Sequence, residues 1–281
     1  MKLIFTKGNA KLDKRIVNFS LPAGYTCPGA HTCLTWADKL TGKIKDAKAQ
    51  SIRCFSASQE ATFPNVRKSR WENFTKLKQA LAEGKEQAAK LIKQSLPKAD
   101  IVRIHVSGDF FSQEYFDAWL DVIKSTPETT FYAYTKSLHF WHIRKNEIPA
   151  NFELTASTGG KWDDLIQQED LNSVVIVNHP TEAGNLVIDH DDSNAYKPGR
   201  PKKFALLIHG TQPKGTKSAA AIQRLKKEQI KFSYAKPSKK ENGPKINTNT
   251  SKRTKITPSL TPVNDLAENI KECSQPHNSA S

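Results

Sequence analysis

Short runs of β-branched and aromatic residues alternate along this chain with longer segments of helical periodicity. Six runs have the length and composition of buried strands: residues 15–21, 100–106, 130–134, 152–156, 173–178 and 203–209. Between them, apolar residues recur at helical spacing over 64–96, 113–125, 138–145, 161–168 and 219–229. Strands separated by helices indicate a parallel sheet with crossover helices, because two parallel neighbours need a long connection between them.

Two residues mark helix boundaries in this pattern. Gly84 interrupts the long helical region, so we expect two helices there and not one. Ser112 precedes a segment whose apolar residues fall on one face, and a serine at that position typically caps a helix.

Small, polar and hydroxyl-bearing residues follow the carboxyl end of each predicted strand. They are Cys27, Ser107, Gly108, Asp109, Lys136, Ser137, Ser157, Thr158, Asn178, His179, His209, Thr211 and Gln212. In a barrel these ends converge on one face, where (β/α) barrels build active sites, whereas an open doubly wound sheet spreads them along an edge. We therefore predict an α/β fold, an incomplete (β/α) barrel with about six mainly parallel strands, as a single domain over residues 1–235.

The composition divides this domain from a basic tail. The chain has 281 residues and a formal net charge of +15, and more than half of that excess lies from Lys214 onward. Residues 236–281 are rich in Lys, Asn, Ser, Thr and Pro and poor in large apolar residues, which predicts disorder. Their charge favours weak, salt-sensitive contact with nucleic acid. A solvating appendage is the favoured interpretation, because no aromatic residues are interleaved to stack on bases.

No apolar run in the chain approaches the roughly 20 residues that span a bilayer, so we expect no membrane partner. The first residues turn charged after a short apolar start, which we interpret as a cytoplasmic protein. In a reducing compartment, clustered cysteines indicate metal binding or catalysis more often than a structural disulfide.

Three of the four cysteines precede the second predicted strand, and Cys273 lies in the tail. Cys27 and Cys33 share a loop that contains Pro and Gly, and Cys54 follows after a long spacer that must fold back if the three thiols are to meet. Four interpretations are open: an iron–sulfur cluster, which prefers thiolate ligands; a zinc site completed by His31; a disulfide between Cys27 and Cys33; and unrelated buried thiols.

The motifs "NFSLPAGYTCPGAHTC", "RCFSASQEA", "VRIHVSGDFFSQEYFDAW", "FYAYTKS", "LTAS" and "FALLIHGTQP" resemble the phage proteins grouped as the gene product 88-like family. The resemblance covers about residues 5–230, with the motifs in the same order. It implies a virus-encoded protein that acts in the cytoplasm of an infected bacterium, with a host or viral partner that the sequence does not identify.

A fainter resemblance is to radical S-adenosylmethionine proteins, in which a cysteine loop after the first strand holds a four-iron, four-sulfur cluster. It implies a [4Fe–4S] cluster on Cys27, Cys33 and Cys54, and S-adenosylmethionine as a second cofactor near Ser107, Gly108 and Asp109. The wide spacing of the three cysteines departs from the close spacing usual in that superfamily.

Together these observations predict an iron–sulfur protein, either a radical-type or a redox enzyme. In such an enzyme Asp109 orients the amino group of a ligand, and the pocket is lined by Lys136, Ser157, His209 and Gln212. Two alternatives belong to other classes of protein. One is a non-enzymatic cluster protein for electron transfer or partner binding, and the other is a nucleic-acid-binding protein with a structural metal site.

Overall fold

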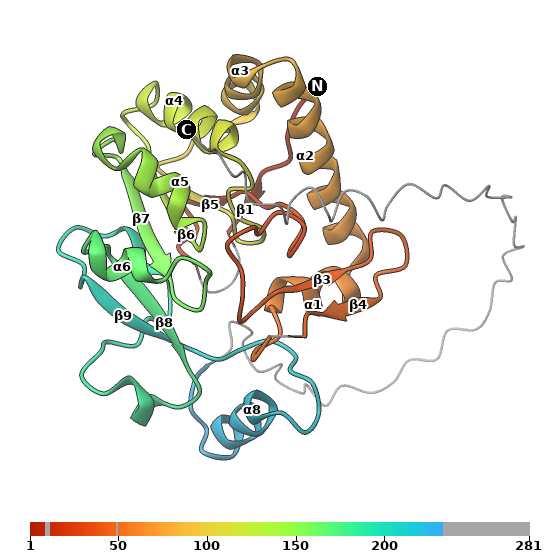
Figure 1. Cartoon of the computed structure of the whole chain (residues 1–281), viewed down its shortest axis with the longest axis vertical. Coiled ribbons are helices and arrows are strands. Elements are labelled where there is room, and N and C mark those ends of the chain that lie inside the picture. The colour runs from red at the N-terminus through yellow and green to blue at the C-terminus, as the bar shows by residue number, and fades with distance from the viewer. Residues whose placement is uncertain (9–11, 49, 233–281) are drawn as a thin grey trace, which may run out of the picture. The chain divides into compact units, whose positions relative to one another are not determined.

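The computed structural model describes residues 1–8, 12–48 and 50–232, and the predicted tail with Cys273 lies outside these ranges (Figure 1). The main sheet has seven strands in the order β1-β2-β5-β6-β7-β8-β9. Their bounds are β1 (Thr6–Lys7), β2 (Ile16–Asn18), β5 (Ile101–Ile104), β6 (Thr130–Thr135), β7 (Phe152–Ser157), β8 (Ser173–Val177) and β9 (Lys203–Leu207). All neighbours from β2 to β9 are parallel, and β1 is antiparallel to β2. All six predicted strands are present.

The strand order is that of a barrel left open. From β2 to β9 each strand of this sheet pairs with the next one along the chain, whereas a doubly wound sheet reverses direction at a switch point. At the last strand, β9, the Ala205 N–H donates to the Val187 carbonyl, and its own carbonyl accepts from the Asp189 N–H, both at 2.9 Å. This short bridge covers the outer edge of β9. The predicted incomplete (β/α) barrel is therefore confirmed.

Every predicted helical segment contains at least one helix, whereas α1 and α7 were not predicted. Their bounds are α1 (Phe55–Thr62), α2 (Pro64–Ala82), α3 (Lys85–Ser95), α4 (Gln113–Lys124), α5 (Leu138–Ile143), α6 (Asp164–Gln168), α7 (Ser193–Tyr196) and α8 (Lys217–Lys227), with 3-10 turns at Lys145–Glu147 and Pro180–Ala183. Gly84 separates α2 from α3 at a φ of +117°, a backbone conformation that favours glycine. Ser112 caps α4 as predicted, because its hydroxyl accepts from the Tyr115 N–H at 3.2 Å.

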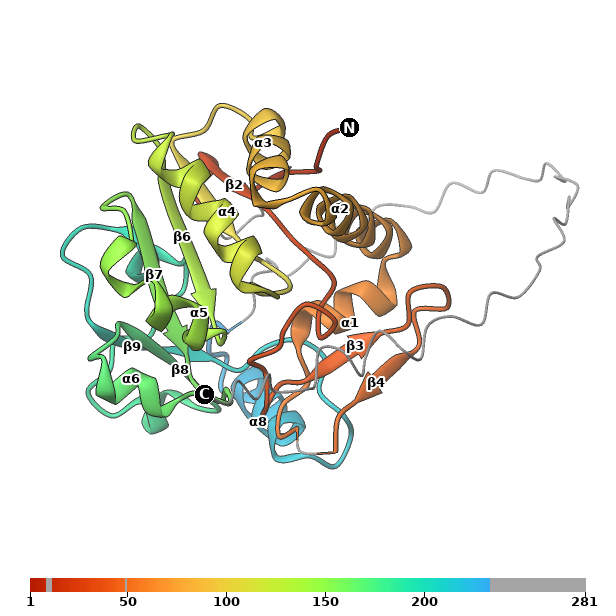
Figure 2. The same cartoon turned by 45° about the horizontal axis from the view of Figure 1, so that its top comes forward.

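The two faces of the sheet contact different parts of the chain, because successive side chains of a strand point to opposite sides. One face packs under α2, α3 and α4, which lie side by side in Figure 2, and forms the main core. From the strands this core includes Val102, Ile104, Phe131 and Ala133. The other, inner face carries Ile101, Tyr132 and Phe204, which pack with Tyr196 of α7.

A second sheet is the hairpin of β3 (Thr35–Ala37) and β4 (Ile44–Asp46), which the sequence pattern did not predict. The hairpin brings the residues after β4 back beside the residues before β3. The Ala47 N–H donates to the Leu34 carbonyl at 3.0 Å, and the Ser51 N–H donates to the Thr32 carbonyl at 2.8 Å. The long spacer between the second and third cysteines therefore folds back.

Candidate functional site

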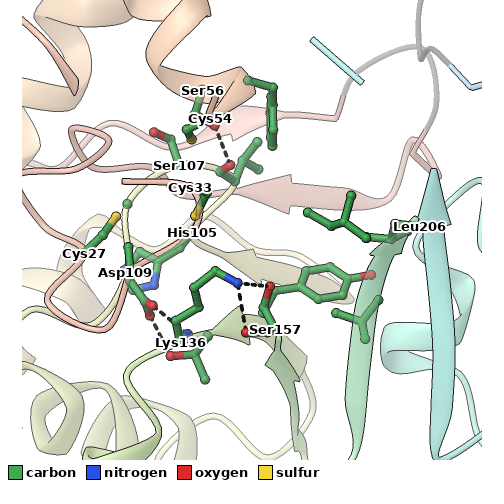
Figure 3. Close-up of a pocket in the computed structure, with 18 of the residues that line it drawn as sticks. Cys27, Cys33, Cys54, Ser56, His105, Ser107, Asp109, Lys136, Ser157 and Leu206 are labelled. Carbon is green, nitrogen blue, oxygen red and sulfur yellow. Dashed lines mark hydrogen bonds between the residues drawn. The ribbon is translucent and has the colours of Figure 1, made fainter. Parts of the chain in front are cut away.

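A cavity of about 170 Å³ lies on the inner face of the sheet, at the carboxyl ends of the strands (Figure 3). All three candidate cysteines line it. They share it with most of the other predicted site residues: Ser107, Gly108, Asp109, Lys136, Ser157 and His209. Seven of the thirteen strand-end residues named in the sequence analysis therefore line this cavity, whereas Ser137, Thr158, Asn178, His179, Thr211 and Gln212 do not.

The loop that carries Cys27 and Cys33 is held against the strand ends by backbone hydrogen bonds. The Asp109 N–H donates to the Thr26 carbonyl at 3.1 Å, which joins the loop to the turn after β5. The Thr32 N–H donates to the Gly159 carbonyl at 3.0 Å, and the Lys161 N–H donates to the Gly29 carbonyl at 2.9 Å. These last two bonds join the loop to the turn after β7.

Two glycines allow this close approach. A Cβ atom on Gly29 would stand 2.1 Å from the Lys136 carbonyl oxygen, far inside van der Waals contact. Gly108 has a φ of +81°, and a Cβ there would lie 2.5 Å from Oγ1 of Thr26. Side chains at these positions would push the cysteine loop away from the cavity.

Cys54 reaches the cavity from a different segment, at the residue just before α1. Its N–H donates to Oγ1 of Thr35 in the hairpin at 3.3 Å. Burial raises the pKa of the Cys54 thiol, and the N–H groups of Ala57 and Ser56 at the start of α1 oppose that rise.

The three thiols are free of disulfides, so the pairing of Cys27 with Cys33 that we considered is not formed. Burial raises the pKa of Cys27 well above the ordinary thiol range. Burial also raises the pKa of Cys33, to about 11, although the ammonium of Lys136 acts in the opposite direction. Within residues 1–8, 12–48 and 50–232, no group of three or more His, Cys, Asp or Glu residues is placed to hold a single metal ion. His31 is exposed.

Asp109 binds the chain itself with both carboxylate oxygens. One oxygen accepts from the Phe110 N–H and from Oγ1 of Thr135, both at 2.7 Å, and the other accepts from the Lys136 N–H at 2.8 Å. Burial raises the pKa of Asp109 to about 6, against the effect of these three hydrogen bonds. Beside it, the Ser107 hydroxyl donates to the buried Glu60 carboxylate at 3.2 Å.

Lys136 and Ser157 form a bridge between the ends of β6 and β7. The Lys136 ammonium donates to the carbonyl and to the hydroxyl of Ser157, each at 2.9 Å, and also to the Thr158 carbonyl. The lysine is only 8% exposed. Its charge therefore lies inside the cavity wall and not in solvent.

The last two predicted residues differ in position. The His209 ring lies against Phe55, with ring centroids 4.6 Å apart, and lines the cavity. Gln212 does not line it. The Gln212 side chain instead binds the backbone of Arg53, next to Cys54.

Sequence reasoning missed the part of the cavity on the inner face of the strands. The missed lining residues there include Arg103, Tyr134, Val174, Ile176, Leu206 and Ile208, and Phe55 of α1 and Asp192 before α7 also line the cavity. A signal was present, because alternation along β8 and β9 places Val174 with Ile176, and Phe204 with Leu206, on the same face. The pattern alone does not reveal which face of a sheet is concave.

The fold and the cavity define an open (β/α) barrel protein with a thiol-lined pocket at the carboxyl ends of its strands. The family described as Gene product 88 matches residues 3–228. The chain belongs to this phage-type family, as the sequence motifs predicted. Comparison with curated proteins and with solved structures gives no match. Within the described ranges, no helix has the length and apolar character needed to cross a membrane.

Proposed function

We propose that this chain is an iron–sulfur protein whose cluster is bound by Cys27, Cys33 and Cys54. The observation that carries the proposal is that three free cysteines from two separate segments line one cavity. Thiolates are the ligands that iron–sulfur clusters prefer.

The donor set favours a cluster over a zinc ion, because three thiols line the cavity and His31 is exposed. In a [4Fe–4S] cluster each thiolate binds a different iron atom, so the sulfur atoms stand further apart than around one zinc ion. The exposed position of His31 leaves the three thiols without the fourth ligand that a closed zinc site requires.

Burial raises the pKa of all three thiols, so a bound cluster would itself have to stabilise the thiolates that a metal requires. Two groups partly oppose that rise: the Lys136 ammonium acts on the pKa of Cys33, and the N–H groups of Ala57 and Ser56 act on that of Cys54. When bound, the cluster would supply electron transfer, and three protein ligands would leave one iron open to a substrate. The cavity beside the thiols would admit that substrate, which supports a redox enzyme.

The narrower form of this proposal is a radical-type enzyme that uses S-adenosylmethionine. Asp109 lines the same cavity as the cysteines and accepts three hydrogen bonds, and a carboxylate has about four acceptor positions. One position would remain for the ammonium of a ligand. Adding S-adenosylmethionine should then change the electron paramagnetic resonance spectrum of the reduced cluster, and Asp109→Asn should weaken that change. An unchanged spectrum would favour an electron carrier or a partner-binding protein.

Membership of a phage-type family supports a site of action in the cytoplasm of the infected bacterium. The direct test of the cluster is purification without oxygen, followed by visible absorption spectroscopy and by analysis of iron and acid-labile sulfide. A brown protein with both elements supports the proposal. Stoichiometric zinc without sulfide would contradict it.

A further inference from the structure

The cavity extends from the thiols along the inner face of β6, β8 and β9. Figure 3 shows Leu206 on the side of the cavity away from Cys27, with Lys136 and Ser157 between them. Aliphatic side chains dominate this distant side; they belong to Val174, Ile176, Leu206 and Ile208. The cavity thus has a thiol end and an apolar end.

Tyr134 supplies an unused polar group beside the apolar end. Its hydroxyl oxygen is buried and has no hydrogen-bond partner among the described residues. The ring lines the cavity and packs against Phe204, with ring centroids 6.3 Å apart. A buried hydroxyl without a partner costs free energy, and native proteins retain few such groups.

The Arg103 cation beside Tyr134 is already paired with a carboxylate. The Arg103 guanidinium lies 5.2 Å from the centre of the Tyr134 ring and forms an ion pair with Asp192. The same Asp192 carboxylate accepts a hydrogen bond from the Tyr132 hydroxyl at 3.2 Å. Burial, and then the nearby Asp192, raise the pKa of Tyr134 well above the ordinary range. Tyr134 therefore keeps its proton and is a hydrogen-bond donor.

We propose that this end of the cavity binds a neutral organic molecule that has a carbonyl-type acceptor and an apolar body. The acceptor takes the hydrogen bond of the Tyr134 hydroxyl, and the body lies against Val174, Ile176 and Leu206. An anionic group is disfavoured, because Asp192 lies nearby and the cation of Arg103 is engaged with it. This molecule would be the substrate of the proposed iron–sulfur site. The inference rests on the proposed cluster for the reaction, but binding of the molecule does not require the cluster.

The test is a ligand-observed NMR titration with three probes of similar size: benzamide, benzoate and toluene. Benzamide should bind more tightly than both others, because only benzamide is neutral and carries a strong acceptor. Tyr134→Phe should weaken benzamide binding roughly tenfold, the cost of one unmade buried hydrogen bond, and leave toluene binding unchanged. Tyr25→Phe removes a phenol that does not line the cavity and should change neither affinity.

Thermal unfolding provides a second measurement on the same variants. Since the Tyr134 hydroxyl has no partner in the ligand-free protein, Tyr134→Phe should leave Tm unchanged or raise it. Equal affinities for benzamide and toluene, or a benzamide preference that survives in Tyr134→Phe, would overturn the inference. Iron and sulfide analysis of the same sample keeps the two proposals separate: an iron-free protein that prefers benzamide contradicts only the cluster.

Discussion

Gln212 binds the backbone of Arg53 in both directions. Its Oε1 accepts from the Arg53 N–H at 2.8 Å, and its Nε2 donates to the Arg53 carbonyl at 3.0 Å. The same Nε2 donates to the His209 carbonyl at 3.1 Å. This one side chain therefore holds the residue before Cys54 against the loop that follows the last strand of the barrel.

Replacing Gln212 with Glu should weaken the contact that holds the backbone next to Cys54 in place. The change leaves the cavity wall intact, because Gln212 does not line the cavity. The variant keeps the acceptor for the Arg53 N–H but sets a carboxylate oxygen against the carbonyls of Arg53 and His209. We expect a loss of about 1–3 kcal/mol in the free energy of unfolding, measured by urea denaturation. Cys54 in the cluster-free protein should also react faster with iodoacetamide, as measured by mass spectrometry.

The matched control for this change is Gln168→Glu, since Gln168 is exposed in α6. It should leave both measurements unchanged. Equal rates of Cys54 alkylation in wild type and Gln212→Glu would show that the contact with Arg53 does not position the cysteine.

A second prediction concerns the contact between the cysteine loop and the end of β6. Gly29→Ala places a methyl group 2.1 Å from the Lys136 carbonyl, so backbone must move; we expect a loss of about 3 kcal/mol or more in unfolding free energy. Gly215→Ala has open space around its Cβ but a φ of +79°, so only backbone strain of about 1 kcal/mol is expected. Urea unfolding that ranks Gly215→Ala as the more damaging change would be inconsistent with this packing.

Sequence periodicity was sufficient for the parallel strands, because each is a short apolar run between helical segments. It was not sufficient for β1, a two-residue edge strand of Thr6 and Lys7 whose side chains are exposed. The β3–β4 hairpin was also missed, since its second strand, residues 44–46, is largely polar and has no buried residue. Strands without a buried face leave no hydrophobic pattern.

For the site, the strand-end rule found the polar half of the cavity and missed the apolar half. Asp109 and Lys136 follow strands and were predicted from position alone. Tyr134 and Leu206 lie within strands whose side chains are apolar on both faces. The handedness of the crossover connections decides which of these faces becomes the interior of the barrel, and the pattern of apolar residues does not show it. Gln212 was assigned to the lining, but it contacts backbone, a role that residue type and spacing do not reveal.

The third prediction is a pH dependence that belongs to Asp109. Its pKa is raised from 3.8 to about 6 by burial, so the folded state binds a proton over a range in which the unfolded chain has lost it. Asp109 therefore contributes stability below about pH 4 that is lost as the pH rises to about 6. The stability of wild type minus that of Asp109→Asn should fall by on the order of 3 kcal/mol between pH 3 and pH 7. A difference that rises with pH would show that hydrogen bonding to the carboxylate outweighs its burial.

The fourth prediction concerns the charge of Lys136. Removing it in Lys136→Met should raise the pKa of Cys33 further above about 11, because the ammonium now lowers it. At a fixed pH near 9 the thiolate fraction falls, so Cys33 in cluster-free protein should be alkylated more slowly by iodoacetamide. Lys161→Met, which changes an exposed lysine, should have no such effect. Faster alkylation of Cys33 in Lys136→Met would point to local unfolding and against an electrostatic role.

The most direct test of the central claim is the iron and acid-labile sulfide content of anaerobically purified wild type and four single cysteine variants. Cys27→Ser, Cys33→Ser and Cys54→Ser should each lose most of the iron and sulfide together with the brown colour. Cys273→Ser should match wild type, because that cysteine belongs to the separate basic tail of the sequence. A wild-type protein without sulfide, or full iron content in any one of the first three variants, would contradict a cluster held by these three cysteines.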